Sequence, residues 1–165
     1  MHEESLQWAL DKIPNADGLD VIEVGGADVN GNIRHLFTKT KSYQCVDIAD
    51  GVGVDIVAPF EHWAFAQQPE MYDLVVSLEV LEHAEGWRQM IQGALRVLRP
   101  GGKFIGTCAT INRAPHSAWG ANEPLPGEHY ANVSPQDLST ELLGFSDWTI
   151  RVTRGSMDIQ WAAVK

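Results

Sequence analysis

Residues 19–26, Leu-Asp-Val-Ile-Glu-Val-Gly-Gly, decide the fold. Apolar side chains predominate up to Val24, and the glycine pair after it permits the sharp turn that follows a buried strand. Further along, residues 72–77 form a nearly continuous apolar run, which is typical of a strand in a sheet covered on both faces. The other predicted strands are residues 43–48, 53–57, 103–107, 145–153 and 158–164.

Helical patterns alternate with these strands. The predicted helices are residues 5–13, 32–37, 63–67, 86–98 and one that begins after the capping residue Ser134. The last two strands are joined by residues 154–157, a connection too short for a parallel crossover. This order predicts a mostly parallel, doubly wound α/β sheet with one antiparallel member. Such a sheet binds ligands beyond the carboxyl ends of its central strands.

Composition and charge narrow the class of protein. A chain of 165 residues suits a single domain, residues 1–165, with a hydrophobic core of its own. The formal charge of −10, with only 12 scattered basic residues, argues against a nucleic-acid groove. No apolar run approaches the roughly 20 residues that span a bilayer, and the acidic start lacks a signal peptide's basic residues. We therefore expect a cytoplasmic protein that binds neither nucleic acid nor a membrane.

The turn after the first strand does not fit a phosphate-binding loop. In a dinucleotide fingerprint G-x-G-x-x-G that starts at Gly25, Ala27 and Asn30 stand where the later glycines are required. In a P-loop that starts at Gly26, Asn32 stands where lysine is required. Both phosphate hypotheses fail, and with them a nicotinamide-dependent oxidoreductase is disfavoured.

Two acidic residues point to a different ligand. Asp28 follows the glycine turn, near a helix start that would otherwise attract a phosphate, and its carboxylate would repel a pyrophosphate. Asp47 ends the second strand, where a carboxylate accepts hydrogen bonds from ribose hydroxyls. A cationic nucleoside without phosphate fits both positions, and S-adenosylmethionine is such a ligand.

Three segments resemble motifs of the class I S-adenosylmethionine-dependent methyltransferases. They are Val-Ile-Glu-Val-Gly-Gly at 21–26, Ser-Leu-Glu-Val-Leu-Glu-His at 77–83 and Arg-Val-Leu-Arg-Pro-Gly-Gly-Lys-Phe at 96–104. The likeness covers nearly the whole chain from residue 19 on. It implies a Rossmann-like sheet of seven strands in the order 3-2-1-4-5-7-6, with strand seven antiparallel, and S-adenosylmethionine as cofactor.

The resemblance also implies roles for individual positions. The backbone of Gly25 to Ala27 would pass under the methionine part, Asp47 would hold the ribose and Ile48 would pack on the adenine. The family's later glycines are replaced here, and Asn30 is expected to reach the cofactor instead. The full set of expected cofactor contacts is Glu23, Gly25, Gly26, Ala27, Asp28, Asn30, Asp47, Ile48, Phe60, Ser77 and Leu78.

The substrate side is less clearly encoded. Residues 109–133 form a long irregular stretch, and a loop of this length in a compact domain is usually functional or disordered. Within it we expect the pair His129 and Tyr130 to contact the substrate. We interpret His83 first as a helix-start residue bonded to the backbone, and the histidine spacing predicts no metal site.

The leading hypothesis is therefore a methyltransferase that acts on a small molecule or on an exposed side chain, with a small-molecule acceptor favoured. The acceptor pocket would come from the N-terminal helix and lid at 1–18, from the loop 109–133 and, in a homodimer, from a second subunit. The alternative is a catalytically silent S-adenosylmethionine-binding module that serves as a partner or sensor subunit. Turnover measurements distinguish the two.

Overall fold

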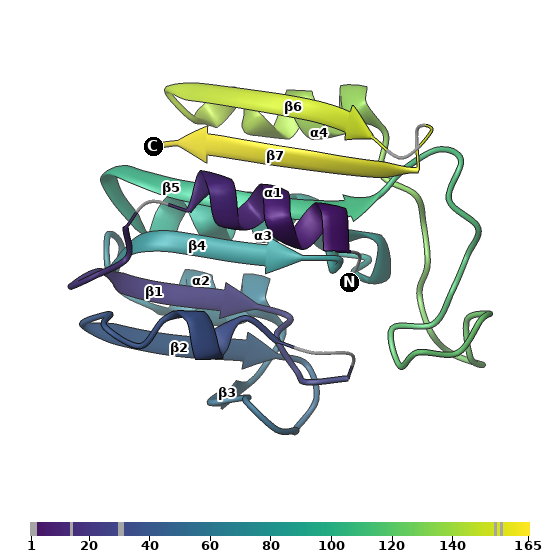
Figure 1. Ribbon diagram of the computed structural model, residues 1–165, viewed down its shortest axis with the longest axis horizontal. Coiled ribbons are helices and arrows are strands. Elements are labelled where there is room, and N and C mark those ends of the chain that lie inside the picture. Colours follow the sequence, from purple (N-terminus) through teal and green to yellow (C-terminus); the bar gives the residue numbers. More distant parts are fainter. Residues whose placement is uncertain (1–2, 14, 30–31, 154, 156) are drawn as a thin grey trace.

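The computed structural model describes residues 3–13, 15–29, 32–153, 155 and 157–165. Its centre is a seven-stranded sheet in the order β3-β2-β1-β4-β5-β7-β6 (Figure 1). The strands are β1 (Asp20–Val24), β2 (Ser42–Asp47), β3 (Ile56–Val57), β4 (Tyr72–Leu78), β5 (Leu98–Ala109), β6 (Asp147–Thr153) and β7 (Asp158–Val164). Strand β7 runs antiparallel to both of its neighbours, and the other pairs are parallel. The predicted topology is confirmed.

Helices cover the two faces of the sheet unequally. The α-helices are α1 (Glu3–Lys12), α2 (Phe60–Ala66), α3 (Trp87–Val97) and α4 (Pro135–Glu141). Single 3-10 turns occur at η1 (Arg34–Leu36), η2 (Leu81–His83) and η3 (Leu142–Gly144). Figure 1 shows α1 on one face of the sheet and α2, α3 and α4 on the other. None of the described helices is long and apolar enough to cross a membrane.

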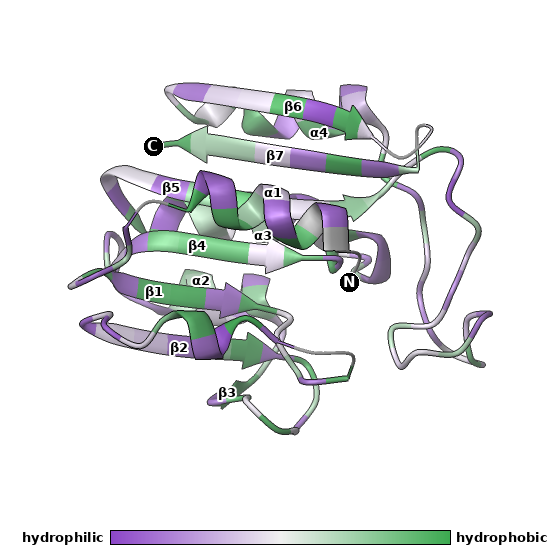
Figure 2. Cartoon of the chain, viewed as in Figure 1, coloured by the Kyte–Doolittle hydropathy of each residue, from purple (hydrophilic) through white to green (hydrophobic). Residues whose placement is uncertain are grey.

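Hydrophobic packing follows from this three-layer arrangement. The larger cluster joins the sheet to α2, α3 and α4, with Trp161, Phe104 and Ile91 among its buried side chains. A smaller cluster under α1 contains Trp8 and Phe37. Figure 2 shows β4 and most of β1 coloured as hydrophobic, whereas β2 and β6 are mixed, as expected for a sheet whose centre is covered on both faces.

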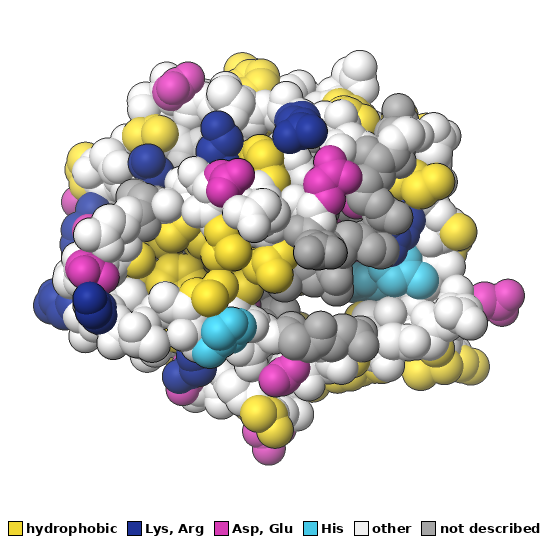
Figure 3. All heavy atoms as spheres, in the orientation of Figure 1, with side chains coloured by type: hydrophobic (Ala, Val, Ile, Leu, Met, Phe, Trp, Pro, Cys, Tyr) yellow, Lys and Arg dark blue, Asp and Glu magenta, His cyan; other side chains and the backbone are white. Residues whose placement is uncertain are grey.

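The N-terminal helix covers the sheet face beside a shallow cavity. Trp8 on α1 is buried in the core, so its side chain packs against the sheet. Between α1 and η1, a cavity of about 240 Å³ is lined partly by Leu10, Ile13 and Phe37, where Figure 3 shows hydrophobic side chains gathered. The lid role suggested for residues 1–18 stays a prediction.

Several element boundaries differ from the sequence-based ones. The helix expected at 32–37 is only the short turn η1, and α2 begins at Phe60 rather than near Trp63. The Pro-Gly-Gly segment ends α3 as expected, but it lies inside β5 as an irregularity rather than before the strand. Tyr72 of β4 pairs with Leu98, and Leu74 already pairs with Lys103. The extra residues form a bulge that the left-handed Gly101, at φ +80°, allows.

The two cysteines agree with the sequence-based expectation. Cys45 lies on β2 and Cys108 on β5, and both are buried and free. Strands β1 and β4 separate β2 from β5 in the sheet. At about 4.8 Å per strand, the two thiols are too far apart for a disulfide.

Candidate functional site

The chain turns sharply directly after β1. Gly25 has a φ of +73°, and its N–H donates to the Val46 carbonyl at 2.8 Å. A β-carbon on Gly26 would lie 2.4 Å from the carboxyl carbon of Glu23 and 2.8 Å from the Sγ of Cys45. The first glycine is required by its left-handed backbone and the second by lack of space. The glycine pair is therefore dictated by the fold as well as by any ligand.

Glu23 supports this turn from below. Its side chain is buried, and the Tyr43 hydroxyl donates to Glu23 Oε2 at 2.5 Å. Burial raises the pKa of Glu23 to about 7, although the Tyr43 hydrogen bond acts in the opposite direction. The carboxyl group therefore changes charge near neutral pH, inside the protein.

Asp47 fastens the end of β2 to the turn after β1. Asp47 Oδ2 accepts from the N–H of Ala27 at 3.1 Å, and Oδ1 accepts from the N–H of Ala49 at 3.1 Å. The side chain is half-buried. Both carboxylate oxygens are thus oriented by backbone groups at the carboxyl ends of two adjacent strands, where doubly wound sheets bind ligands.

Asp28 adds a second carboxylate to this edge. It is exposed, and its Oδ2 accepts from Asn32 Nδ2 at 3.1 Å. Its N–H donates to the Val52 carbonyl at 3.1 Å, so the turn after β1 also contacts the loop after β2. Arg34 pairs with Asp55 on that loop. The expected contact residue Asn30 lies outside the described residues.

Apolar side chains flank the end of β2. Ile48, next to Asp47, is 70% exposed. Its side chain is therefore accessible to the flat ring of a ligand. Phe60, by contrast, is 3% exposed and packs against Trp63, with ring centroids 5.9 Å apart. The Phe60 side chain belongs to the core, which leaves only its backbone for a ligand contact.

The end of β4 lies beside the first turn, because Ser77 pairs with Val24 of β1. Ser77 Oγ is buried and makes no hydrogen bond within the described structure, and Leu78 is half-buried. The next residue, Glu79, has a φ of +59°, a conformation that costs energy in a residue with a β-carbon. Two hydrogen bonds to Thr107 hold Glu79 in this conformation. The Thr107 carbonyl accepts from the Glu79 N–H at 2.8 Å, and the Thr107 hydroxyl donates to Glu79 Oε1 at 2.7 Å.

A second buried glutamate, Glu82, holds both ends of the long loop that follows β5, one through its side chain and the other through its backbone. Glu82, on η2, is fully buried. Its Oε1 accepts from the N–H of Ala109 at 2.9 Å, and its backbone carbonyl accepts from the N–H of Ala131 at 2.8 Å. Burial and repulsion from Glu79 raise the pKa of the Glu82 carboxyl. Sequence reasoning missed the role of this residue, because nothing in the motif distinguishes a buried glutamate from an exposed one.

Three rings meet above Glu82. His83 makes edge-to-face contacts with His116 and Tyr130, at centroid distances of 5.0 Å and 5.4 Å. Burial lowers the pKa of His83 to about 4, so its imidazole is neutral at physiological pH. The predicted pair His129 and Tyr130 is divided, since Tyr130 belongs to this cluster and His129 is exposed. Only the path of the loop brings His116 here, and the sequence gives no signal for that path.

Comparisons with known proteins place the chain in a family. A family model described as methyltransferase domain matches residues 22–106, just over half of the chain. A ubiquinone biosynthesis O-methyltransferase of Saccharophagus degradans is 35% identical over 68 residues, 41% of this chain and 28% of the relative. A protein of the same name from Cupriavidus pinatubonensis is 28% identical over 120 residues, 66% of this chain and 47% of the relative.

A solved structure shows the same fold over nearly the whole chain. The crystal structure of a SAM-dependent methyltransferase from Archaeoglobus fulgidus superposes with a TM-score of 0.72, covering 97% of this chain and 91% of that one, at 12% identity. The chain spans less than half the length of the curated relatives described above. From the matched family model, the motifs and the sheet order, the chain belongs to the class I S-adenosylmethionine-dependent methyltransferase family.

Proposed function

We propose that the protein transfers a methyl group from S-adenosylmethionine to a small-molecule acceptor. The observation that carries this proposal is the orientation of Asp47. Its carboxylate is fixed by Ala27 and Ala49 beside the glycine turn, which supports a role in binding ribose hydroxyls. The carboxylate of Asp28 on the same edge disfavours a pyrophosphate and favours a cationic ligand.

The cofactor would span the carboxyl ends of β2, β1 and β4. In this arrangement the adenine packs on the exposed side chain of Ile48 and the ribose hydroxyls donate to Asp47. The methionine part lies over Gly25 and Gly26 and reaches the end of β4. There the hydroxyl of Ser77, which has no hydrogen-bond partner among the described residues, is a candidate partner for a polar group of the ligand.

Methyl transfer from a sulfonium needs little covalent assistance. The acceptor's lone pair forms a bond to the methyl carbon while the carbon–sulfur bond breaks, which leaves neutral S-adenosylhomocysteine. The protein chiefly aligns the two reactants and excludes water. The segment between Ala109 and Val133 passes the carboxyl ends of the strands (Figure 1), which supports the expectation that it forms the surface for the acceptor.

We infer that the nucleophile is an oxygen atom on an apolar molecule. The curated relatives described above are named O-methyltransferases, which supports oxygen. The long loop carries the exposed apolar side chains Ile111, Trp119 and Leu125, at 63%, 45% and 46% exposure. The exposure of three large apolar side chains on one loop supports contact with an apolar substrate.

A transfer assay tests this function. The protein is incubated with methyl-labelled S-adenosylmethionine and a panel of phenols, catechols and aliphatic alcohols, and S-adenosylhomocysteine and labelled product are measured together. We expect equimolar formation of both with at least one aromatic hydroxyl compound. The matched controls are Asp47→Ala, which should abolish turnover at low cofactor concentration, and Asp147→Ala, an exposed aspartate at the start of β6. Cofactor binding without transfer across the panel would favour the silent module instead.

A further inference from the structure

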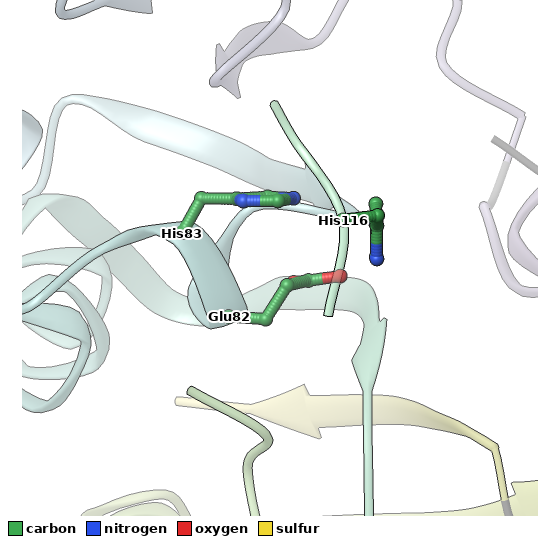
Figure 4. Close-up of side chains that lie close together, drawn as sticks. All are labelled: Glu82, His83 and His116. Carbon is green, nitrogen blue, oxygen red and sulfur yellow. The ribbon is translucent and has the colours of Figure 1, made fainter. Parts of the chain in front are cut away.

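Three metal-ligating side chains converge at the carboxyl edge of the sheet. Glu82, His83 and His116 each offer one ligand atom, and these atoms all lie within 4.8 Å of one another. Figure 4 shows Glu82 and His83 extending from η2 toward His116 on the long loop. Two adjacent residues of a short turn and one residue 33 positions later thus meet at one point.

Two buried atoms of this cluster have no hydrogen-bond partner within the described structure. They are Glu82 Oε2 and His83 Nδ1. Glu82 is fully buried, and its other oxygen already accepts from Ala109. Removing a polar atom from water without giving it a partner destabilises the fold, so native proteins rarely leave one unsatisfied without a reason.

The third side chain is oriented as metal-binding histidines are. His116 Nδ1 lies 3.2 Å from the carbonyl oxygen of Ala114. A carbonyl oxygen only accepts, so Nδ1 carries the proton and Nε2 carries the lone pair. A backbone carbonyl on one ring nitrogen is the usual device that fixes the tautomer of a ligating imidazole.

The electrostatics of the surroundings favour a cation. Glu82 is fully buried and Glu79 is half-buried, so the two carboxylates would repel each other if both were ionised. Arg113 acts favourably on both, but its guanidinium is engaged with the buried carboxylate of Asp158 at 3.2 Å. A divalent ion beside Glu82 would relieve this repulsion.

We propose that Glu82, His83 and His116 bind a divalent transition-metal ion, with Zn²⁺ as the best match. Two imidazole nitrogens and one carboxylate oxygen form a donor set typical of catalytic zinc sites, which keep a further position open. Ligand atoms at about 2.0–2.2 Å from the ion lie roughly 3.3 Å apart in tetrahedral geometry. The present spread of up to 4.8 Å therefore requires only small rotations, which the half-buried His116 on its loop permits.

The open position gives the site a role in the transfer, and this role rests on the proposed function. An acceptor hydroxyl that coordinates the ion loses its proton to solvent more readily, because the metal stabilises the oxyanion. The oxyanion is then the nucleophile that takes the methyl group from the sulfonium. The site lies directly after the end of β4, which also contributes Ser77 and Leu78 to the proposed cofactor site.

Metal titration of the full chain tests the inference. Chelator-treated protein is titrated with Zn²⁺ by calorimetry and with Co²⁺ by visible absorption. We expect one equivalent of either ion and a Co²⁺ spectrum of nitrogen and oxygen ligands. His116→Ala and His83→Ala should each weaken binding at least 100-fold. His62→Ala, which removes an exposed histidine from α2, should leave the affinity unchanged.

S-adenosylhomocysteine binding and the circular dichroism spectrum of each variant accompany this titration. These two measurements show whether each variant is folded. The His116 variant should fold as the wild type does, because His116 lies on the loop and not in the core. No stoichiometric ion, or unchanged affinity in folded His116→Ala and His83→Ala, overturns the metal site. If the wild type binds S-adenosylhomocysteine but no ion, the site is wrong and the proposed function stands. If it binds the ion but not S-adenosylhomocysteine, the site stands and the proposed function fails.

Discussion

The carboxylate of Asp47 accepts a hydrogen bond from the backbone N–H of Ala27 at 3.1 Å, which joins the end of β2 to the turn after β1. The two residues are 20 positions apart in sequence. This contact brings together two features that the sequence shows separately, an acidic residue at the end of a strand and a glycine pair after another strand. A ligand seated on the glycine turn would therefore meet a carboxylate that is already oriented.

Replacing Asp47 should weaken cofactor binding strongly. We expect Asp47→Ala to reduce the affinity for S-adenosylhomocysteine by roughly 1.5–3 kcal/mol, the scale of hydrogen bonds to a charged group. Calorimetric titration of the folded variant measures the change. The matched variant Asp147→Ala should bind as the wild type does, and equal affinity in all three proteins would remove Asp47 from the site.

The glycine turn should be intolerant of a methyl group at one position. Gly26→Ala places a β-carbon against the buried Glu23 carboxyl group and the Cys45 thiol, so we expect a loss of about 1–3 kcal/mol in the free energy of unfolding. Gly51→Ala is the control, because its new β-carbon would meet only Ala27 at 3.7 Å. Denaturant unfolding compares the two, and a Gly26→Ala variant as stable as Gly51→Ala would contradict the close packing at Gly26.

Glu23 should make stability depend on pH near neutrality. Its pKa is about 7 in the folded protein, above the ordinary 4.5, so folding disfavours its ionised form. Below about pH 4.5 the group is protonated in both states and costs nothing. As the pH rises toward 7 it ionises first in the unfolded chain, and the folded state loses stability on the order of 3 kcal/mol, with little further change above pH 7.

The isosteric variant Glu23→Gln isolates this effect. It keeps an acceptor for the Tyr43 hydroxyl but has no charge to bury. We expect Glu23→Gln to gain stability relative to the wild type between pH 5 and pH 8, as measured by urea unfolding at each pH. A stability difference that does not change with pH would contradict the raised pKa.

Glu82 should anchor the long loop even without a metal ion. Glu82→Ala leaves the buried N–H of Ala109 without its acceptor, which costs about 1–3 kcal/mol. In the presence of a chelator, we expect faster proteolysis within the loop that follows β5. Glu123→Ala, an exposed substitution in the same loop, should leave the cleavage rate unchanged. Equal rates in the two variants would argue against the anchor.

The sheet could be predicted because its signals are local. The apolar run of β4 and the glycine pair after β1 each depend on a few adjacent residues. The capped start of α4 is equally local, since Ser134 Oγ accepts from the N–H of Asp137 at 3.0 Å, as expected for a serine followed by proline. The misplaced boundary at β5 has a different cause, because a bulge depends on pairing with the neighbouring strand.

The substrate side could not be predicted because, like the bulge in β5, it depends on contacts between residues far apart in the sequence. The meeting of His83 with His116 depends on how an irregular loop folds back, and that loop has no periodicity from which its path could be inferred. The burial of Phe60 likewise follows from α2 beginning earlier than the pattern suggested. The charge at the cofactor side could be predicted because Asp47 is the last residue of β2 and Asp28 lies four residues after the end of β1.

The most direct test of the central claim is a pair of calorimetric titrations of the wild-type protein, one with S-adenosylhomocysteine and one with NAD. We expect S-adenosylhomocysteine to bind with one equivalent per chain and NAD not to bind, because Asp28 and the glycine turn disfavour a pyrophosphate. Binding of NAD without binding of S-adenosylhomocysteine would contradict this claim.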